Sequence, residues 1–110
     1  MLEGLYRIRY ETPAGERTGV SIFQAGQIVG GGQHLYCVGT YEVNGTKFSG
    51  EILARRHAKT AETSPLAGFD QVKLRLEGTV TDTYGQLTAT VIGCADVPPM
   101  HGSILRISDV

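Results

Sequence analysis

Helical periodicity, long apolar runs and an excess of one charge are all missing from this sequence of 110 residues. Its formal net charge is −1, so no overall positive field is available to collect phosphate groups, and we expect no binding to nucleic acid. No apolar run is long enough for a signal peptide or a membrane-spanning helix. These absences predict a cytoplasmic protein without a membrane partner.

Cysteine is also scarce, with Cys37 and Cys94 as the two examples. They lie far apart in strand-like segments, and a disulfide between them would require an oxidising compartment. For a cytoplasmic chain we expect two reduced thiols, packed as small hydrophobic side chains.

Alternation of apolar and polar residues is the pattern that the sequence does have, and it is typical of strands with one buried face. Tyr6, Ile8 and Tyr10, for example, alternate with charged residues. Similar segments occupy residues 20–23, 27–29, 34–43, 46–55, 72–80, 87–93 and 103–108. About seven or eight antiparallel strands with mostly short loops predict an all-β domain over residues 1–110, either an up-and-down barrel or a small sandwich.

A hairpin is predicted at Asn44-Gly45, because this dipeptide supplies the positive φ angles of a two-residue type I′ turn. The turn sets the register, and the partners share one face of the sheet. The expected pairs are Tyr41 with Phe48, Gly39 with Gly50, Cys37 with Ile52, and Leu35 with Ala54.

A second two-residue turn is predicted at Tyr84-Gly85, with Val80 opposite Ala89. Residues 57–68 between the two hairpins lack alternation. We expect a loop there with at most a short helix, which Ser64-Pro65 would begin.

One set of short motifs resembles the GrlR-like family, which is named for a negative regulator of type III secretion. The motifs are Gly4-Leu5-Tyr6, Gln27-Ile28-Val29-Gly30-Gly31-Gly32 followed by Tyr36, Gly39 and Tyr41, and the Asn-Gly hairpin. The resemblance covers most of the chain in element order. It departs from the family at Gly32, where aspartate is common.

The resemblance implies a lipocalin-like (calycin-like) up-and-down barrel of about eight strands that forms a homodimer. It further implies binding to a regulatory protein partner, as the named regulator binds a helix-turn-helix activator through an acidic hairpin tip. The matching tip here consists of Glu42, Val43, Asn44 and Gly45, with one acid.

The register of the hairpin also suggests a dimer face. Tyr36, Val38 and Leu53 fall on the side of the sheet opposite the core. Apolar residues gathered on an outer sheet surface indicate either a contact with another protein or scattered single exposures, which are normal.

The interior of an eight-strand barrel is either filled by side chains or holds one small ligand. A mixture of large residues and glycines permits both a packed core and a cavity for an apolar small molecule. The candidate lining residues are Tyr6, Ile8, Tyr10, Gly39, Tyr41, Phe48, Gly50, Leu74 and Leu76.

No motif for catalysis, a metal or another cofactor emerges from the sequence. The histidines lack the spacing of a metal site, and the serines lack the context of a nucleophile. The triple glycine precedes no helix that could bind phosphate, so we interpret it as a bulge or strand crossing. The residues concerned are His34, His57 and His101, Ser21 and Ser49, and Gly30 to Gly32.

A short basic run, Arg55-Arg56-His57 with Lys59, follows a predicted strand. It is either a solvated guard against aggregation or a contact for an anionic surface. The sequence as a whole predicts a non-enzymatic regulatory, protein-binding barrel, with a carrier or sensor of a small apolar ligand as the alternative.

Overall fold

The computed structural model describes residues 2–12, 15–57, 70–94 and 96–109, and these contain strands and no helix. Apolar residues at every second position give each strand one face to bury, which a sheet satisfies and a helix would not. The strands are β1 (Gly4–Thr12), β2 (Gly15–Gln24), β3 (Gln27–Gly31), β4 (Leu35–Asn44), β5 (Lys47–Arg56), β6 (Gln71–Val80), β7 (Tyr84–Val91) and β8 (Met100–Ser108).

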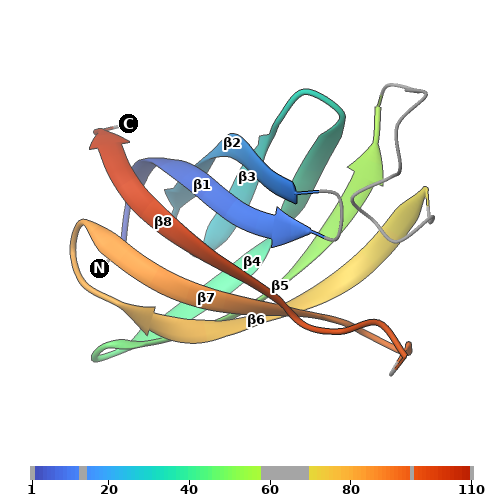
Figure 1. Cartoon of the computed structure of the whole chain (residues 1–110). Helices are drawn as coiled ribbons and strands as arrows, with labels where there is room; N and C mark the ends of the chain where they lie inside the picture. Colours follow the sequence, from blue (N-terminus) through green and yellow to red (C-terminus); the bar gives the residue numbers. More distant parts are fainter. Residues whose placement is uncertain (1, 13–14, 58–69, 95, 110) are drawn as a thin grey trace.

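The eight strands form one closed antiparallel barrel in which every strand lies beside its neighbours in the chain (Figure 1). β1 pairs with β8, with Ile8 opposite Ile104, and this pairing closes the sheet. The up-and-down barrel is therefore confirmed over the sandwich. Because Leu5 pairs with Ser108, the two ends of the chain lie at the same end of the barrel.

The predicted register of the β4–β5 hairpin is wrong by two residues. Asn44 pairs with Lys47, so Gly45 and Thr46 form the loop, and Tyr41 faces Gly50 instead of Phe48. Gly45 has a φ of 65°, whereas Asn44 has a negative φ. One positive φ at the first loop position is typical of a type II′ turn, not type I′. A shift of two keeps every side chain on its predicted face.

The predicted turn at Tyr84-Gly85 is also wrong. The chain reverses over residues 81–84, where the Thr81 N–H donates to the Tyr84 carbonyl at 2.7 Å. Val80 then pairs with Gly85 instead of Ala89, a shift of four that again preserves the faces. The short helix predicted at Ser64-Pro65 lies outside the described residues.

One end of the barrel, which we call the aromatic end, is filled by Tyr6, Phe23, Tyr41 and Phe48, all at most 6% exposed. The Phe23 ring has its centroid 5.1 Å from Tyr6, 5.4 Å from Tyr41 and 6.0 Å from Phe48, each in an edge-to-face arrangement. Edge-to-face contacts add to the free energy gained by burying the rings. The four rings therefore form one contiguous aromatic cluster.

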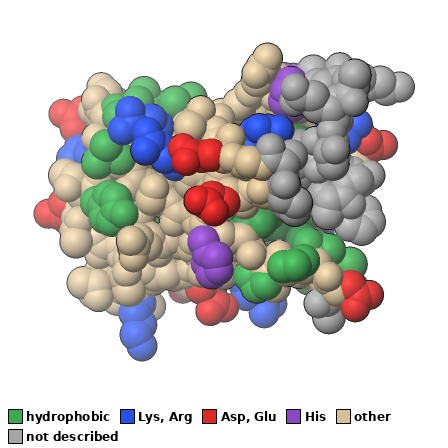
Figure 2. All heavy atoms as spheres, in the orientation of Figure 1, with side chains coloured by type: hydrophobic (Ala, Val, Ile, Leu, Met, Phe, Trp, Pro, Cys, Tyr) green, Lys and Arg blue, Asp and Glu red, His purple; other side chains and the backbone are tan. Residues whose placement is uncertain are grey.

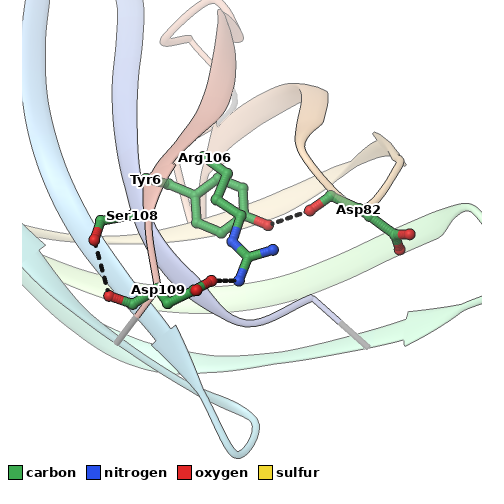
Figure 3. Close-up of polar contacts among 5 residues, drawn as sticks. All are labelled: Tyr6, Asp82, Arg106, Ser108 and Asp109. Atoms are coloured by element: carbon green, nitrogen blue, oxygen red, sulfur yellow. Dashed lines mark hydrogen bonds and ion pairs between the residues drawn. The ribbon is translucent and has the colours of Figure 1, made fainter.

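The tyrosine hydroxyls of the aromatic end are satisfied by backbone. Tyr6 donates to the Asp82 carbonyl at 2.9 Å, and Tyr41 donates to the Leu2 carbonyl. Burial raises the pKa of both tyrosines, so both remain protonated donors. Figure 3 shows the Arg106 side chain beside Tyr6, with its guanidinium paired to Asp109 near the exit of β8. Polar groups thus cover the outer surface of the cluster.

We expect Phe23→Ala to lower the free energy of unfolding by about 3–5 kcal/mol, because it removes the ring that touches the other three aromatics. Urea denaturation followed by circular dichroism measures the change. Ile107→Ala, at a side chain that is 48% exposed, serves as the control and should change stability by less than about 0.5 kcal/mol. Equal losses for the two variants would contradict the assignment of Phe23 to the centre of the core.

Candidate functional site

The half of the barrel away from the aromatic end is hollow, with a cavity of about 140 Å³. Inward positions there carry short residues, including Gly19, Ala54, Ala89 and Gly102, where the aromatic end has rings. Most of the larger lining side chains are apolar, among them Ile8, Leu35, Ile52, Leu74, Leu87 and Ile104. An engineered apolar cavity of about 150 Å³ holds benzene, so this space suits a small apolar molecule.

A few uncharged polar groups also line the cavity. The Ser21 hydroxyl, which is buried, lies 3.9 Å from the Cys37 thiol. Burial raises the pKa of Cys37, although hydrogen bonds from Ser21 and from the Gly30 backbone oppose this. Burial likewise raises the pKa of Tyr10, against the nearby positive charge of Arg17. At neutral pH the cavity wall is therefore polar at these points without being charged.

The structure divides the residues that the sequence suggested as a cavity lining. Ile8, Tyr10, Leu74 and Leu76 line the cavity. Tyr6, Tyr41 and Phe48 instead pack together at the aromatic end. Ser21 and Cys37 were not predicted as polar groups of the cavity wall, although the alternation of their strands places both side chains inward.

Gly39 and Gly50 permit close approach of backbone and do not create the cavity. A Cβ atom on Gly39 would lie 2.1 Å from the Glu51 carbonyl oxygen, and one on Gly50 would lie 2.7 Å from that of Thr40. Gly30 is equally tight, with a Cβ 2.2 Å from the Val20 carbonyl oxygen. Gly30 and Gly31 pair in unbroken register with β2 and β4, so the predicted bulge or strand crossing is wrong, and the glycines instead allow paired strands to lie close together.

A row of apolar residues crosses the outside of the barrel from β1 to β5, and we call it the outer ladder. Each member is the direct cross-strand partner of the next: Leu5, Ile22, Val29, Val38 and Leu53. At a strand spacing of about 4.8 Å the row extends for about 19 Å. Val29 is 53% exposed and Val38 39%. The three central members, Ile22, Val29 and Val38, are exposed and adjacent, with Leu5 and Leu53 half-buried at the ends, which differs from scattered single apolar residues.

The outer ladder contains two of the residues predicted for a dimer face, Val38 and Leu53. Tyr36 shares their outer face, but it lies two residues along β4, opposite Arg55 and stacked on the His57 ring at 6.5 Å. Ile22 and Val29 were not predicted to belong to this outer face, because the sequence-based registers covered only the two longer hairpins. The Ala25-Gly26 turn, where both residues have positive φ, joins β2 to β3. This dipeptide was the sequence signal from which the pairing of Ile22 with Val29 could have been predicted.

The hairpin tip presents fewer side chains than its sequence suggested. Glu42, Asn44 and Gly45 are exposed, while Val43 points inward and packs against the core. Figure 2 shows another side of the molecule, with β8 and β7 in front, where charged side chains of both signs lie among small apolar groups.

Among the described residues, no group of three or more His, Cys, Asp or Glu side chains is placed to hold a metal ion. His57 and His34 are joined by a backbone hydrogen bond, in which the His57 N–H donates to the His34 carbonyl at 2.9 Å. This bond does not involve their imidazole rings. His101 contacts the Thr88 hydroxyl on the opposite part of the barrel. Within the same residues, no helix is long and apolar enough to cross a membrane.

No protein-family model matches this chain, and no curated protein matches it either. Its functional interpretation therefore depends on two features of the barrel, the cavity and the outer ladder.

We expect the Cys37 thiol to react slowly with iodoacetamide at pH 8, because its raised pKa lowers the fraction of reactive thiolate and burial limits access. Mass spectrometry of the Cys94→Ser variant measures the rate, with glutathione as the reference thiol. The same variant in urea should react at an ordinary rate. Equal folded and unfolded rates would contradict the burial of Cys37 in the cavity wall.

Proposed function

We propose that the protein is a non-enzymatic, cytoplasmic regulatory barrel that dimerises through the outer ladder and acts by binding another protein. The ladder is the observation that carries this proposal, because its exposed Ile22, Val29 and Val38 side chains would be covered in a complex. The resemblance to GrlR-like regulators supports it. Such a protein would bind a partner such as a transcriptional activator through surfaces that the dimer leaves exposed, including Glu42 and Asn44 at the hairpin tip.

The shape of the outer ladder favours a second copy of the chain as its occupant. Val29 is its most exposed member, and a shallow hollow lies two strands away, lined by Val38, Glu51, Leu53 and Lys73. A twofold contact is self-complementary, and here each copy could place its exposed Val29 in the hollow of the other.

We expect Val38→Glu to shift the protein from dimer to monomer, since the carboxylate would be buried without a partner in the contact. Because Val38 is exposed in the single barrel, the monomer should remain folded. Sedimentation velocity at several concentrations measures the shift, and thermal melting checks the fold.

Thr90→Glu is the matched control, since Thr90 is exposed on β7, away from the ladder, opposite Arg75. It should leave the dimer intact. A wild-type protein that is monomeric at high concentration would refute dimerisation by the outer ladder.

The cavity supports a second candidate function, the binding of a small apolar molecule. Its volume and apolar lining are the specific observation, because dense packing alone would have filled this half of the barrel. Ligand binding is compatible with a regulatory role, since the cavity and the outer ladder are on opposite faces of the same strands.

We expect wild-type protein to bind 1-octanol with a negative heat-capacity change, as burial of apolar surface predicts. Ala89→Leu should reduce binding severely, because Ala89 lines the cavity and a larger side chain would fill it. Isothermal titration calorimetry measures both, and thermal melting confirms that the variant is folded. If Ala89→Leu bound 1-octanol as well as the wild type does, the octanol site would lie outside the cavity.

A further inference from the structure

Ser21 and Cys37 meet on the cavity wall although their strands are not neighbours. β3 lies between them, and its Gly30 pairs with Ser21 on one side and with Cys37 on the other. A side chain at Gly30 would collide with the Ser21 hydroxyl. The glycine therefore leaves the space in which Ser21 Oγ lies 3.9 Å from Cys37 Sγ.

Ser21 is an exception among the residues of this interior. Tyrosines aside, it is the only polar residue that is buried within the described part of the chain, with 4% of its surface exposed. A buried hydroxyl normally has a hydrogen-bond partner that offsets its loss of water. Here the partner is a thiol, which is a weak donor and a weak acceptor. The protein alone therefore satisfies the Ser21 hydroxyl poorly.

The pair formed by Ser21 and Cys37 also has one hydrogen more than it uses. The hydroxyl and the thiol carry one hydrogen each, and either can donate to the other, so their contact uses one of the two. Within the described residues neither side chain donates a second hydrogen bond. A buried donor without an acceptor is unfavourable, because it has lost its water partner. An acceptor atom in the cavity would use the spare hydrogen, with the thiol donating to Ser21 Oγ and the hydroxyl donating to the ligand.

The cavity lining contains no Asp, Glu, Lys, Arg or His side chain among the residues that the structure describes. Burial raises the pKa of Tyr10, as Cys37 does to a smaller extent, so the Tyr10 hydroxyl is neutral at pH 7. The positive charge that acts on Tyr10 is that of Arg17, which is not part of the lining. An anion in this space would lose its hydration without contacting an opposite charge in the wall. The lining therefore favours an uncharged molecule.

We propose that the cavity selects a small uncharged carbonyl compound, such as a ketone, whose oxygen accepts a hydrogen bond from the Ser21 hydroxyl and whose carbon skeleton contacts the apolar wall. This inference rests on the ligand-binding function proposed for the cavity. A ketone oxygen accepts without donating, so it uses the spare hydrogen and introduces no donor that would itself need a partner. The volume of about 140 Å³ is close to that of an engineered cavity of about 150 Å³ that holds benzene, so a single ring with a short substituent is a suitable probe.

The test compares three molecules of the same skeleton at pH 7 by isothermal titration calorimetry. They are acetophenone, α-methylstyrene, in which a CH₂ group replaces the carbonyl oxygen, and benzoate, in which a charged oxygen replaces the methyl group. Wild-type protein should bind acetophenone more tightly than benzoate by roughly tenfold or more, because the charge has no partner in the lining. Ser21→Ala should weaken acetophenone binding by roughly fivefold, as expected for loss of a neutral hydrogen bond that the Cys37 thiol replaces only weakly. Binding of α-methylstyrene should not change, which also shows that the variant remains folded.

Ser49→Ala is the matched control, because it makes the same change at a serine that is exposed on the outer face of β5. It should bind acetophenone as the wild type does. If benzoate bound as tightly as acetophenone, or if Ser21→Ala left acetophenone binding unchanged or weakened α-methylstyrene equally, the carbonyl ligand would be overturned. Binding of α-methylstyrene would then leave the apolar cavity function standing. Binding of none of the three molecules would overturn the cavity function itself, and the carbonyl ligand with it.

Discussion

The pairing of β1 with β8 is the contact on which the rest of the structure depends. Eight strands with alternating faces could form an open sheet, but this pairing removes both edges and turns the shared apolar face into an interior. The features of the interior follow from closure. The cavity and the aromatic cluster exist because one side of each strand has become the inside of a barrel.

Side-chain size divides that interior into two functional halves. Four aromatic rings fill the end where β1 begins and β8 ends. The two tyrosines among them, Tyr6 and Tyr41, donate their hydroxyls to the backbone carbonyls of Asp82 and Leu2. At the other end glycine and alanine occupy inward positions, and the space that they leave is not refilled by neighbours. The packed half can therefore maintain the shape of the barrel independently of the hollow half, which is where we propose that a ligand binds.

The two candidate functions use opposite faces of the same strands. β4, for example, carries Cys37 on the cavity wall and Val38 on the outer ladder. A ligand that changed the packing of the inner residues could thus alter the outer contact without a moving domain. Whether ligand and partner binding are coupled in this way would be measured as a change in the affinity of one when the other is bound, and the coupling would be reciprocal.

The sequence by itself determined the strand content, the face of each side chain and the absence of helix from the described residues, because period-two alternation is a local property. It did not determine the partners: the β4–β5 register was wrong by two residues and the β6–β7 register by four, since an even shift preserves both faces and local pattern cannot detect it. The turns that form in the folded sheet, at Gly45-Thr46 and over residues 81–84, set those registers. Pairing of neighbouring strands also aligned Ile22, Val29 and Val38 into one row, and closure of the barrel enclosed the unfilled space that glycine and alanine line, because both depend on which residues become neighbours in three dimensions.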